Sequence, residues 1–228
     1  MKSPITLRPI THRSSRPPVL PMLLLLLPLA ATSLTGCNVL GFLGGSGERR
    51  KIDVKAAYTD LENQRVAVMV ISDDATGIVH REAMRKLGSM AAARIAGRVP
   101  GVTLADPEQL DDFARANPYW TSLPHGDLPE RLEVDRVVMI DIHRYRLRSP
   151  DARDRWLGHL EARVGVIEAG SRLGRDFAFE SEVAVKFPEG APYGVAEATA
   201  RHIEHGLLER TSLTVARLFH DHTIENTR

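Results

Sequence analysis

The sequence predicts an α/β fold, of the α+β kind, in which helices pack on a single mixed β-sheet. Residues 65–72 (RVAVMVIS) form a nearly continuous apolar run of β-formers, and three later segments alternate apolar with polar residues. A continuous run is typical of a strand buried on both faces, whereas alternation is typical of an antiparallel strand with one exposed face. Segments with helical periodicity separate and follow these strands, so we expect the order β-α-β-α-β-β-β-α.

The first half of this order contains two helices. Residues 80–98 place apolar side chains at helical spacing, opposite a row of Arg and Lys. A short strand at 102–105 follows. Asp106 is expected to cap a second helix that opens with Pro107. Residues 117–129 hold three prolines and are expected to form a loop.

The second half contains three strands and a long C-terminal helix. The strands are expected at 136–147, 156–168 and 175–187, and small residues within 169–174 indicate a hairpin between the last two. Residues 195–221 have the pattern of one amphipathic helix, long enough at about 1.5 Å per residue to cross the whole sheet.

Composition places the chain among globular proteins and argues against nucleic-acid binding. Of the 228 residues, 43% are hydrophobic and 26% are charged. The only charged residues before Cys37 are four basic ones, and without them the chain has 26 basic against 29 acidic residues, a net charge of −3. A mildly acidic domain lacks the basic surface that nucleic acids require, so we expect no nucleic-acid partner.

The N-terminal segment has the form of an export signal. Residues 1–16 are basic, residues 19–31 are apolar but too short for a membrane span, and Leu34-Thr35-Gly36-Cys37 resembles a lipobox. A small Gly36 gives the peptidase access to the bond before Cys37, the only cysteine of the chain, whose sulfur then accepts the lipid. We therefore expect residues 1–36 to be a lipoprotein signal peptide, with cleavage between Gly36 and Cys37 and lipidation of Cys37.

The expected domain plan follows from this anchor. Residues 37–57 are expected to be the lipidated cysteine and a flexible Gly-rich tether, and residues 58–228 a domain that faces the periplasm. Acyl chains contribute about 0.8 kcal/mol per buried CH₂, which is enough for durable attachment to a membrane. Because Asn38, not Asp, follows the cysteine, the outer membrane is favoured over the inner.

Several phrases between Arg65 and Phe219 resemble a group of periplasm-facing proteins. The group comprises the curli-secretion lipoprotein family, the N-terminal domain of the Tol-system propeller protein, and lipoprotein activators of penicillin-binding proteins. The matching phrases are RVAVMVISDD, PGVTLADPEQLDDF, LEVDRVVMIDIHRYRL and LEARVGVIEAGSRLGRDFAFESEV, together with the helix at 80–98.

The resemblance implies a binding or assembly role at the cell envelope. The chain departs from the usual pattern at Glu133-Val134-Asp135, where Gly or Ala and then Ala-Asp is typical, and at Glu168, where Asp is usual. No segment resembles the membrane-inserting hairpins of the curli pore, so we do not expect a secretion channel.

Two polar groups offer an alternative chemistry. His202 and His205 lie three residues apart on the last helix, a spacing that can bring two imidazoles to one metal ion, although no third ligand stands at a fixed distance. Asp73 and Asp74 follow the first strand, where α/β sheets often bind ligands. A solvated helix face explains the histidines without a metal, and turn formation with helix capping explains the aspartates. His220-Asp221-His222 is expected to be a frayed end.

We expect a non-enzymatic envelope lipoprotein that uses no cofactor and binds another envelope protein or a second copy of itself. No Gly-x-Ser-x-Gly elbow or phosphate loop supports catalysis. Tyr119 and Trp120, on a Pro-rich loop, are the expected partner contact, although they can equally fold back on the sheet. The alternative is a small-molecule or metal-binding lipoprotein that uses the strand-end carboxylates or the helix histidines.

Overall fold

The structure is a computed structural model that describes residues 50–72, 76, 79–149, 151, 154–169 and 177–226. The chain divides into two units, Met1–Glu48 and Arg49–Arg228, and the described residues all lie in the second. The predicted signal peptide, Gly36, Cys37 and most of the predicted tether therefore lie outside the described residues, as do Asp73 and Asp74.

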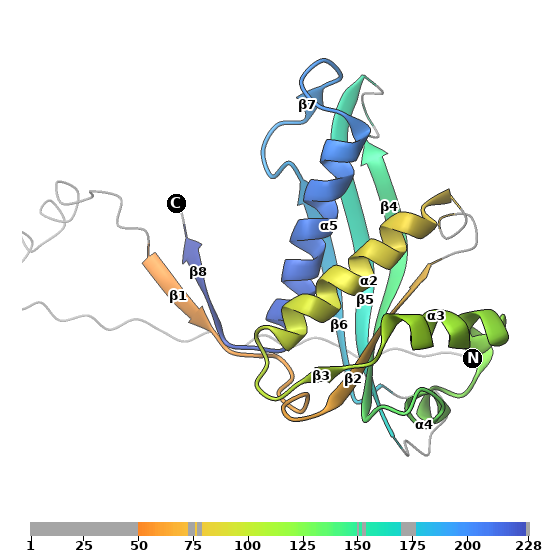
Figure 1. The fold of residues 1–228 in the computed structure, drawn as a ribbon. Helices are drawn as coiled ribbons and strands as arrows, with labels where there is room; N and C mark the ends of the chain where they lie inside the picture. Colours follow the sequence, from red (N-terminus) through yellow and green to blue (C-terminus); the bar gives the residue numbers. More distant parts are fainter. Residues whose placement is uncertain are drawn as a thin grey trace, which may run out of the picture. The chain divides into compact units, whose positions relative to one another are not determined.

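The second unit is built on a mixed sheet with the strand order β3-β2-β4-β5-β6. Strand β2 is parallel to β3 and β4, whereas β5 is antiparallel to both of its neighbours, β4 and β6 (Figure 1), which confirms the predicted mixed sheet. The strands are β2 (Arg65–Ser72), β3 (Thr103–Leu104), β4 (Arg136–Arg148), β5 (Arg155–Glu168) and β6 (Phe179–Phe187). The short β7 (Tyr193–Gly194) pairs with the start of β5.

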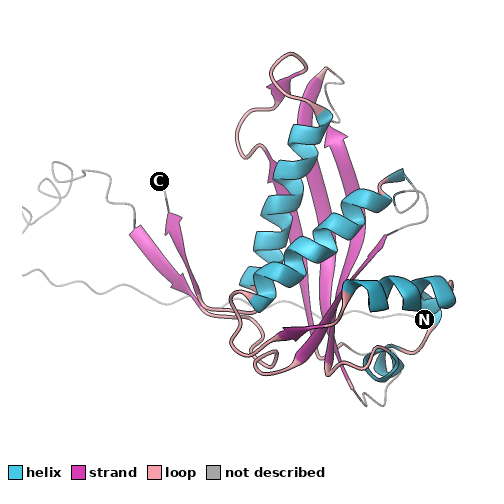
Figure 2. Ribbon diagram, viewed as in Figure 1, coloured by secondary structure: helices cyan, strands magenta, loops and turns pink. Residues whose placement is uncertain are grey.

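Helices cover both faces of this sheet, though unequally. Helices α2 (Arg81–Ala96) and α5 (Ala200–Arg217) lie together on one face (Figure 2), over the larger buried cluster. Helices α3 (Pro107–Ala116) and α4 (Leu128–Arg131), with two 3₁₀ turns at Trp120–Ser122 and His125–Asp127, accompany a smaller cluster on the other face. Alternate residues of β2 enter each cluster, as its continuous apolar run predicts.

Local capping chemistry sets the starts of two helices. The carboxylate of Asp106 accepts a hydrogen bond from the Glu108 amide at 2.8 Å, which confirms the predicted N-cap of α3. The hydroxyl of Thr199 accepts from the His202 amide at 3.2 Å and caps α5. Helix α5 therefore begins at Ala200 and ends at Arg217, and the predicted range 195–221 is too long at both ends.

Both ends of the described chain meet in a two-stranded ribbon that the sequence analysis does not predict. Strand β1 (Arg50–Val54) pairs antiparallel with β8 (His222–Asn226), with Ile52 opposite Ile224. The prediction of a flexible tether over 37–57 is therefore wrong for 50–54, and the prediction of a frayed end at 220–222 is also wrong. The physical reason is backbone pairing between segments far apart in sequence.

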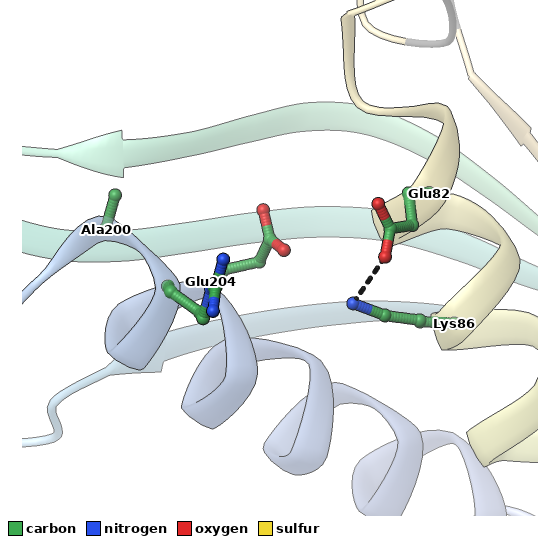
Figure 3. Close-up of a pocket in the computed structure, with 5 residues that line it drawn as sticks. Glu82, Lys86, Ala200 and Glu204 are labelled. Carbon is green, nitrogen blue, oxygen red and sulfur yellow. Dashed lines mark ion pairs between the residues drawn. The ribbon is translucent and has the colours of Figure 1, made fainter.

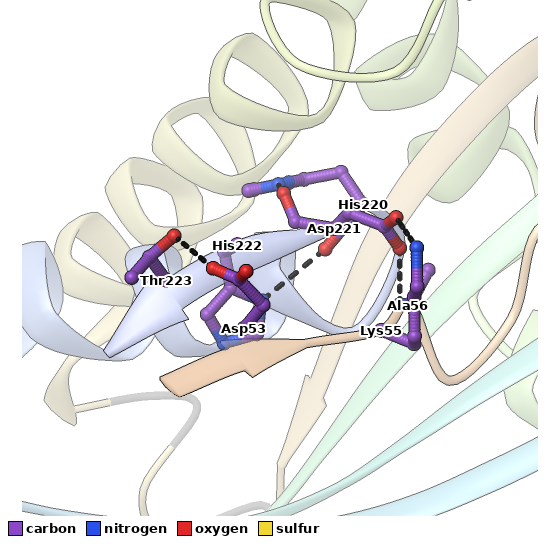
Figure 4. Close-up of polar contacts among 7 residues, drawn as sticks. All are labelled: Asp53, Lys55, Ala56, His220, Asp221, His222 and Thr223. Atoms are coloured by element: carbon purple, nitrogen blue, oxygen red, sulfur yellow. Dashed lines mark hydrogen bonds and ion pairs between the residues drawn. The ribbon is translucent and has the colours of Figure 1, made fainter. Parts of the chain in front are cut away.

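The base of the ribbon is joined to the end of α5. The amides of Ala57 and Tyr58 both donate to the Leu218 carbonyl, at 2.8 and 3.1 Å. The carboxylate of Asp221 accepts from Lys55 Nζ at 2.6 Å and from the Ala56 amide at 2.9 Å (Figure 4). Among the described residues, no helix is long and apolar enough to cross a membrane.

Candidate functional site

A groove with a volume of about 1020 Å³ lies between helix α5 and the edge strand β6. Strand β6 forms one wall with Val185, Lys186 and Phe187, and α5 forms the other. Both wall elements are placed by the core, because Val183 and Val185 of β6 and Leu207 of α5 belong to the same buried cluster. The groove is therefore a fixed feature of the sheet edge.

The aromatic floor of the groove depends on a glycine. The ring of Phe187 lies against Gly206 of α5, where an added Cβ would stand 2.7 Å from Phe187 Cδ1 and nearer still to other ring atoms. Glycine in a helix interior is normally unfavourable, so its presence here reflects this close approach. The imidazole of His202 packs on the same ring at a centroid distance of 5.7 Å, and Tyr193 lies 6.1 Å from His202.

Charged side chains border this floor, and several of them are paired. The guanidinium of Arg94 donates to Glu209 at 3.0 Å and to the Ser212 hydroxyl at 2.9 Å, which ties α2 to α5. Arg210 forms an ion pair with Glu189 and also lies 5.7 Å from the centre of the Phe187 ring. Because such half-exposed pairs contribute little to stability, their main effect is to fix the charge pattern of the groove.

Both members of the predicted histidine pair lie in this groove. His202 and His205 both line the groove, and His202 is engaged with Phe187 and Tyr193. Among the described residues, no group of three or more His, Cys, Asp or Glu side chains is placed to hold a metal ion. His202 therefore packs against two aromatic rings, and whether the histidine pair binds a metal ion stays a prediction.

A smaller pocket of about 560 Å³ lies between the N-terminal halves of α2 and α5 (Figure 3). Its lining includes an ion pair between Lys86 and Glu82 at 2.8 Å, and the hydrogen bond from Lys86 lowers the pKa of Glu82. Beside it, Tyr145 donates to Glu204 at 3.3 Å; burial and this carboxylate raise the pKa of Tyr145. The tyrosine therefore stays protonated at neutral pH, and the pocket presents balanced charges with no activated nucleophile among its lining residues.

The structure places the two residues of the predicted contact pair, Tyr119 and Trp120, in different surroundings. Tyr119 is 83% exposed, whereas Trp120 is half-buried and packs against the smaller cluster, as Phe113 and Leu123 also do. The loop thus presents one aromatic residue to solvent and uses the other to cover the sheet. Whether Tyr119 and Trp120 contact a partner stays a prediction.

Sequence reasoning did not identify β6 as part of a site. Its residues predict an ordinary half-exposed strand, and on the neighbouring helix the sequence predicts only the histidine pair. The signal that was available is Gly206, a glycine inside a strongly helical pattern, which often marks a close approach of another element. Nothing in the sequence says that the approaching element is Phe187.

Comparisons with known proteins return structural likenesses only. A scan against protein families finds no match, and a search of curated proteins finds no similar sequence. Among solved structures, the PelC dodecamer from Paraburkholderia phytofirmans is 12% identical, with a TM-score of 0.39 over 74% of this chain and 96% of that one. Lipoprotein GNA1162 from Neisseria meningitidis is 14% identical, with a TM-score of 0.40 over 67% of this chain and 95% of that one.

These two likenesses carry no argument about what this chain does, because both TM-scores are 0.40 or lower. The family resemblance drawn from the sequence accordingly stays a prediction.

Proposed function

We propose that this chain is a lipoprotein of the cell envelope, anchored to a membrane through Cys37, whose α/β domain is a non-enzymatic assembly module. The observation that carries the proposal is the run Leu34-Thr35-Gly36-Cys37, placed directly after a short apolar segment and containing the only cysteine of the chain. Asn38 favours the outer membrane. Strand β1 begins at Arg50, so the tether of this proposal is confined to residues 38–49.

The chemistry of the groove supports an assembly role over catalysis. The hydroxyl that lines it belongs to Thr214, which donates to the Arg210 carbonyl at 2.9 Å inside its own helix. The groove residues supplied by β6 are Ala184, Val185, Lys186 and Phe187. The strand wall opposite the two imidazoles therefore carries no carboxylate, hydroxyl or thiol group. An aromatic floor with a charged rim is typical of protein contact surfaces.

The anchor is tested by the mass of the mature protein. The full chain is expressed in a Gram-negative host, membranes are isolated, and the N-terminal peptide is analysed by mass spectrometry. We expect an N-terminus at Cys37 that carries acyl chains. The matched control is the double substitution Cys37→Ser and Ser46→Cys, which keeps a thiol in the segment but removes it from the lipobox. An unmodified thiol at Cys37, or acylation at position 46 in the control, refutes the anchor.

The assembly role is tested by crosslinking in the same cells. A photo-crosslinking amino acid at Lys186, on the groove wall, is compared with one at Glu62, which is exposed on a different part of the domain. We expect a discrete adduct from Lys186 and none from Glu62. Equal labelling from both positions would indicate random collision and would contradict a defined contact surface at the groove.

A further inference from the structure

The two edges of the central sheet differ in a way that bears on association. One edge is β3, which has two residues; the other is β6, which has nine residues and no proline. Among the described strands β6 pairs only with β5, so the backbone groups of its outer edge have no strand partner there. A long edge with unpaired backbone groups is a template for another strand.

The side chains of β6 are arranged symmetrically about Val183. On the face that carries α2 and α5, half-buried Phe179 and Phe187 stand at equal distances in sequence from this residue. On the opposite face, which is exposed along β6 and is called the open face below, Glu180 and Lys186 stand at equal distances in sequence from Val183 and carry opposite charges. When a strand pairs antiparallel with a copy of itself about a twofold axis, residues at equal distances from the centre become opposite neighbours.

We propose that two copies of this chain associate by antiparallel pairing of their β6 strands, centred on Val183. In this register each Phe179 faces Phe187 of the second copy, and each Glu180 faces Lys186 of the second copy. Aromatic pairs and pairs of opposite charge are the cross-strand combinations that stabilise a sheet. The whole of β6 takes part, so the sheet continues across the twofold axis.

Neighbouring registers are less complementary. Centring the pair on Glu182 places this carboxylate directly opposite its own copy, which is destabilising. Centring it on Ala184 sets Glu180 opposite Pro188, outside the strand, and shortens the paired segment. The register centred on Val183 alone uses all nine residues and both charge pairs.

The charges on the open face continue an existing pattern. Arg163 of β5 lies 3.4 Å from Asp141 of β4 and 3.7 Å from Glu180 of β6, so the sign alternates from strand to strand. Lys186 of a second copy would extend this alternation by one more strand. The same pairing would close the outer side of the α5–β6 groove, whose wall includes Ala184 and Lys186. The inference thus deepens the proposed assembly function by naming the partner, a second copy.

The test uses charge reversal in two differently tagged full-length copies. The copies are expressed in one cell and extracted in mild detergent; one tag is captured and the other is quantified. Wild-type copies should be captured together. Glu180→Lys in both copies, or Lys186→Glu in both copies, sets like charges opposite each other twice and should reduce capture about tenfold or more.

The decisive arm combines the two variants. A Glu180→Lys copy with a Lys186→Glu copy restores both attractive pairs, so capture should return to the wild-type level. Glu182→Lys, which faces Ala184 in this register, is the matched control and should change capture by less than about threefold. All three altered positions are exposed, and circular dichroism checks that each variant is folded.

Two results overturn the proposal. In the first, wild-type copies are not captured together and the purified protein sediments as a monomer. The charges on β6 would then protect the edge from pairing. The second is a mixed pair that fails like the single variants, or a Glu182→Lys effect as large as that of Glu180→Lys. The mass of the Cys37 peptide is measured in the same samples, so failure of the anchor and failure of the pairing are read separately.

Discussion

Replacing Gly206 by alanine tests whether the groove floor is as closely packed as the structure indicates. Two effects oppose each other at this position. Alanine is favoured over glycine in a helix interior by about 0.8–1.0 kcal/mol. The added methyl group, however, would overlap the ring of Phe187, and forcing extra volume into a packed site costs typically about 1–3 kcal/mol. We therefore expect Gly206→Ala to lower the free energy of unfolding by about 1 kcal/mol.

Replacing Phe187 as well separates the steric overlap from the helix preference. In a Phe187→Ala background the overlap is gone, so only the helix preference remains, and Gly206→Ala should raise the free energy of unfolding by about 1 kcal/mol. The effect of one substitution thus changes sign between two backgrounds, a coupling of about 2 kcal/mol. Gly190→Ala is the matched control, because a Cβ there meets nothing within 4 Å.

The assay is urea unfolding followed by far-ultraviolet circular dichroism, with the slope of the transition checked for constancy among the variants. Equal effects of Gly206→Ala in both backgrounds would refute the reasoning, because the ring and the glycine would then not be in contact. A stabilising effect in the wild-type background would show that the ring moves aside at little cost. Either result would also remove the argument that Phe187 has a fixed position in the groove.

Three further predictions concern other parts of the molecule. Asp106→Ala removes the cap of α3 and should lower the free energy of unfolding by about 1 kcal/mol, measured by urea unfolding. The hydrogen bond from Lys55 lowers the pKa of Asp221, so the base of the ribbon is stabilised at neutral pH and loosens as the pH falls through this lowered pKa. The amide NMR shifts of β1 should report this transition, and the transition should vanish in Asp221→Asn. Trp120→Ala should destabilise the domain by about 1–3 kcal/mol, whereas Tyr119→Ala should change the unfolding midpoint little.

Much of the fold is predictable because its signals are local. The apolar run that forms β2 needs no partner to be recognised as a buried strand, and Asp106 with Pro107 marks the start of α3 by side-chain and backbone chemistry alone. The alternation that predicts β5 and β6 also predicts their antiparallel pairing, since half-exposed strands are typical of such sheets.

The ribbon is not predictable in the same way. Strand β1 begins in a basic stretch and β8 begins at the last residue of His220-Asp221-His222, so each has at most two apolar residues to mark it as a strand. Each becomes a strand because the other supplies its backbone partner, and the two are far apart in the chain. The long-range bond from Lys55 to Asp221 then fixes the entry into the ribbon. Only tertiary contacts define this element, so a local reading assigns it to a tether and a frayed end.

The candidate site is likewise only partly predictable from the sequence. His202 and His205 are visible in the sequence as a helical pair, and the structure places both on the groove. Their surroundings are set by Phe187, which arrives from a different element through the space left by Gly206. A spacing rule can find two imidazoles on one helix face, but it cannot tell whether a third ligand or an aromatic ring completes the site.

The proposed lipid anchor and the proposed pairing of β6 are connected through local concentration. Pairing through one strand offers few side-chain contacts, so two copies in free solution would associate weakly. Copies tethered to the same membrane meet repeatedly, and linking two binding partners in this way can raise apparent affinity by about 10²–10⁴ without any new contact. Charges that match in only one register suit frequent encounters, because they oppose pairing with other strands and in other registers while they allow β6 to pair with a second β6. If both proposals hold, the lipid tether raises the rate of encounters between copies, and the charge pattern of β6 selects the register in which they pair.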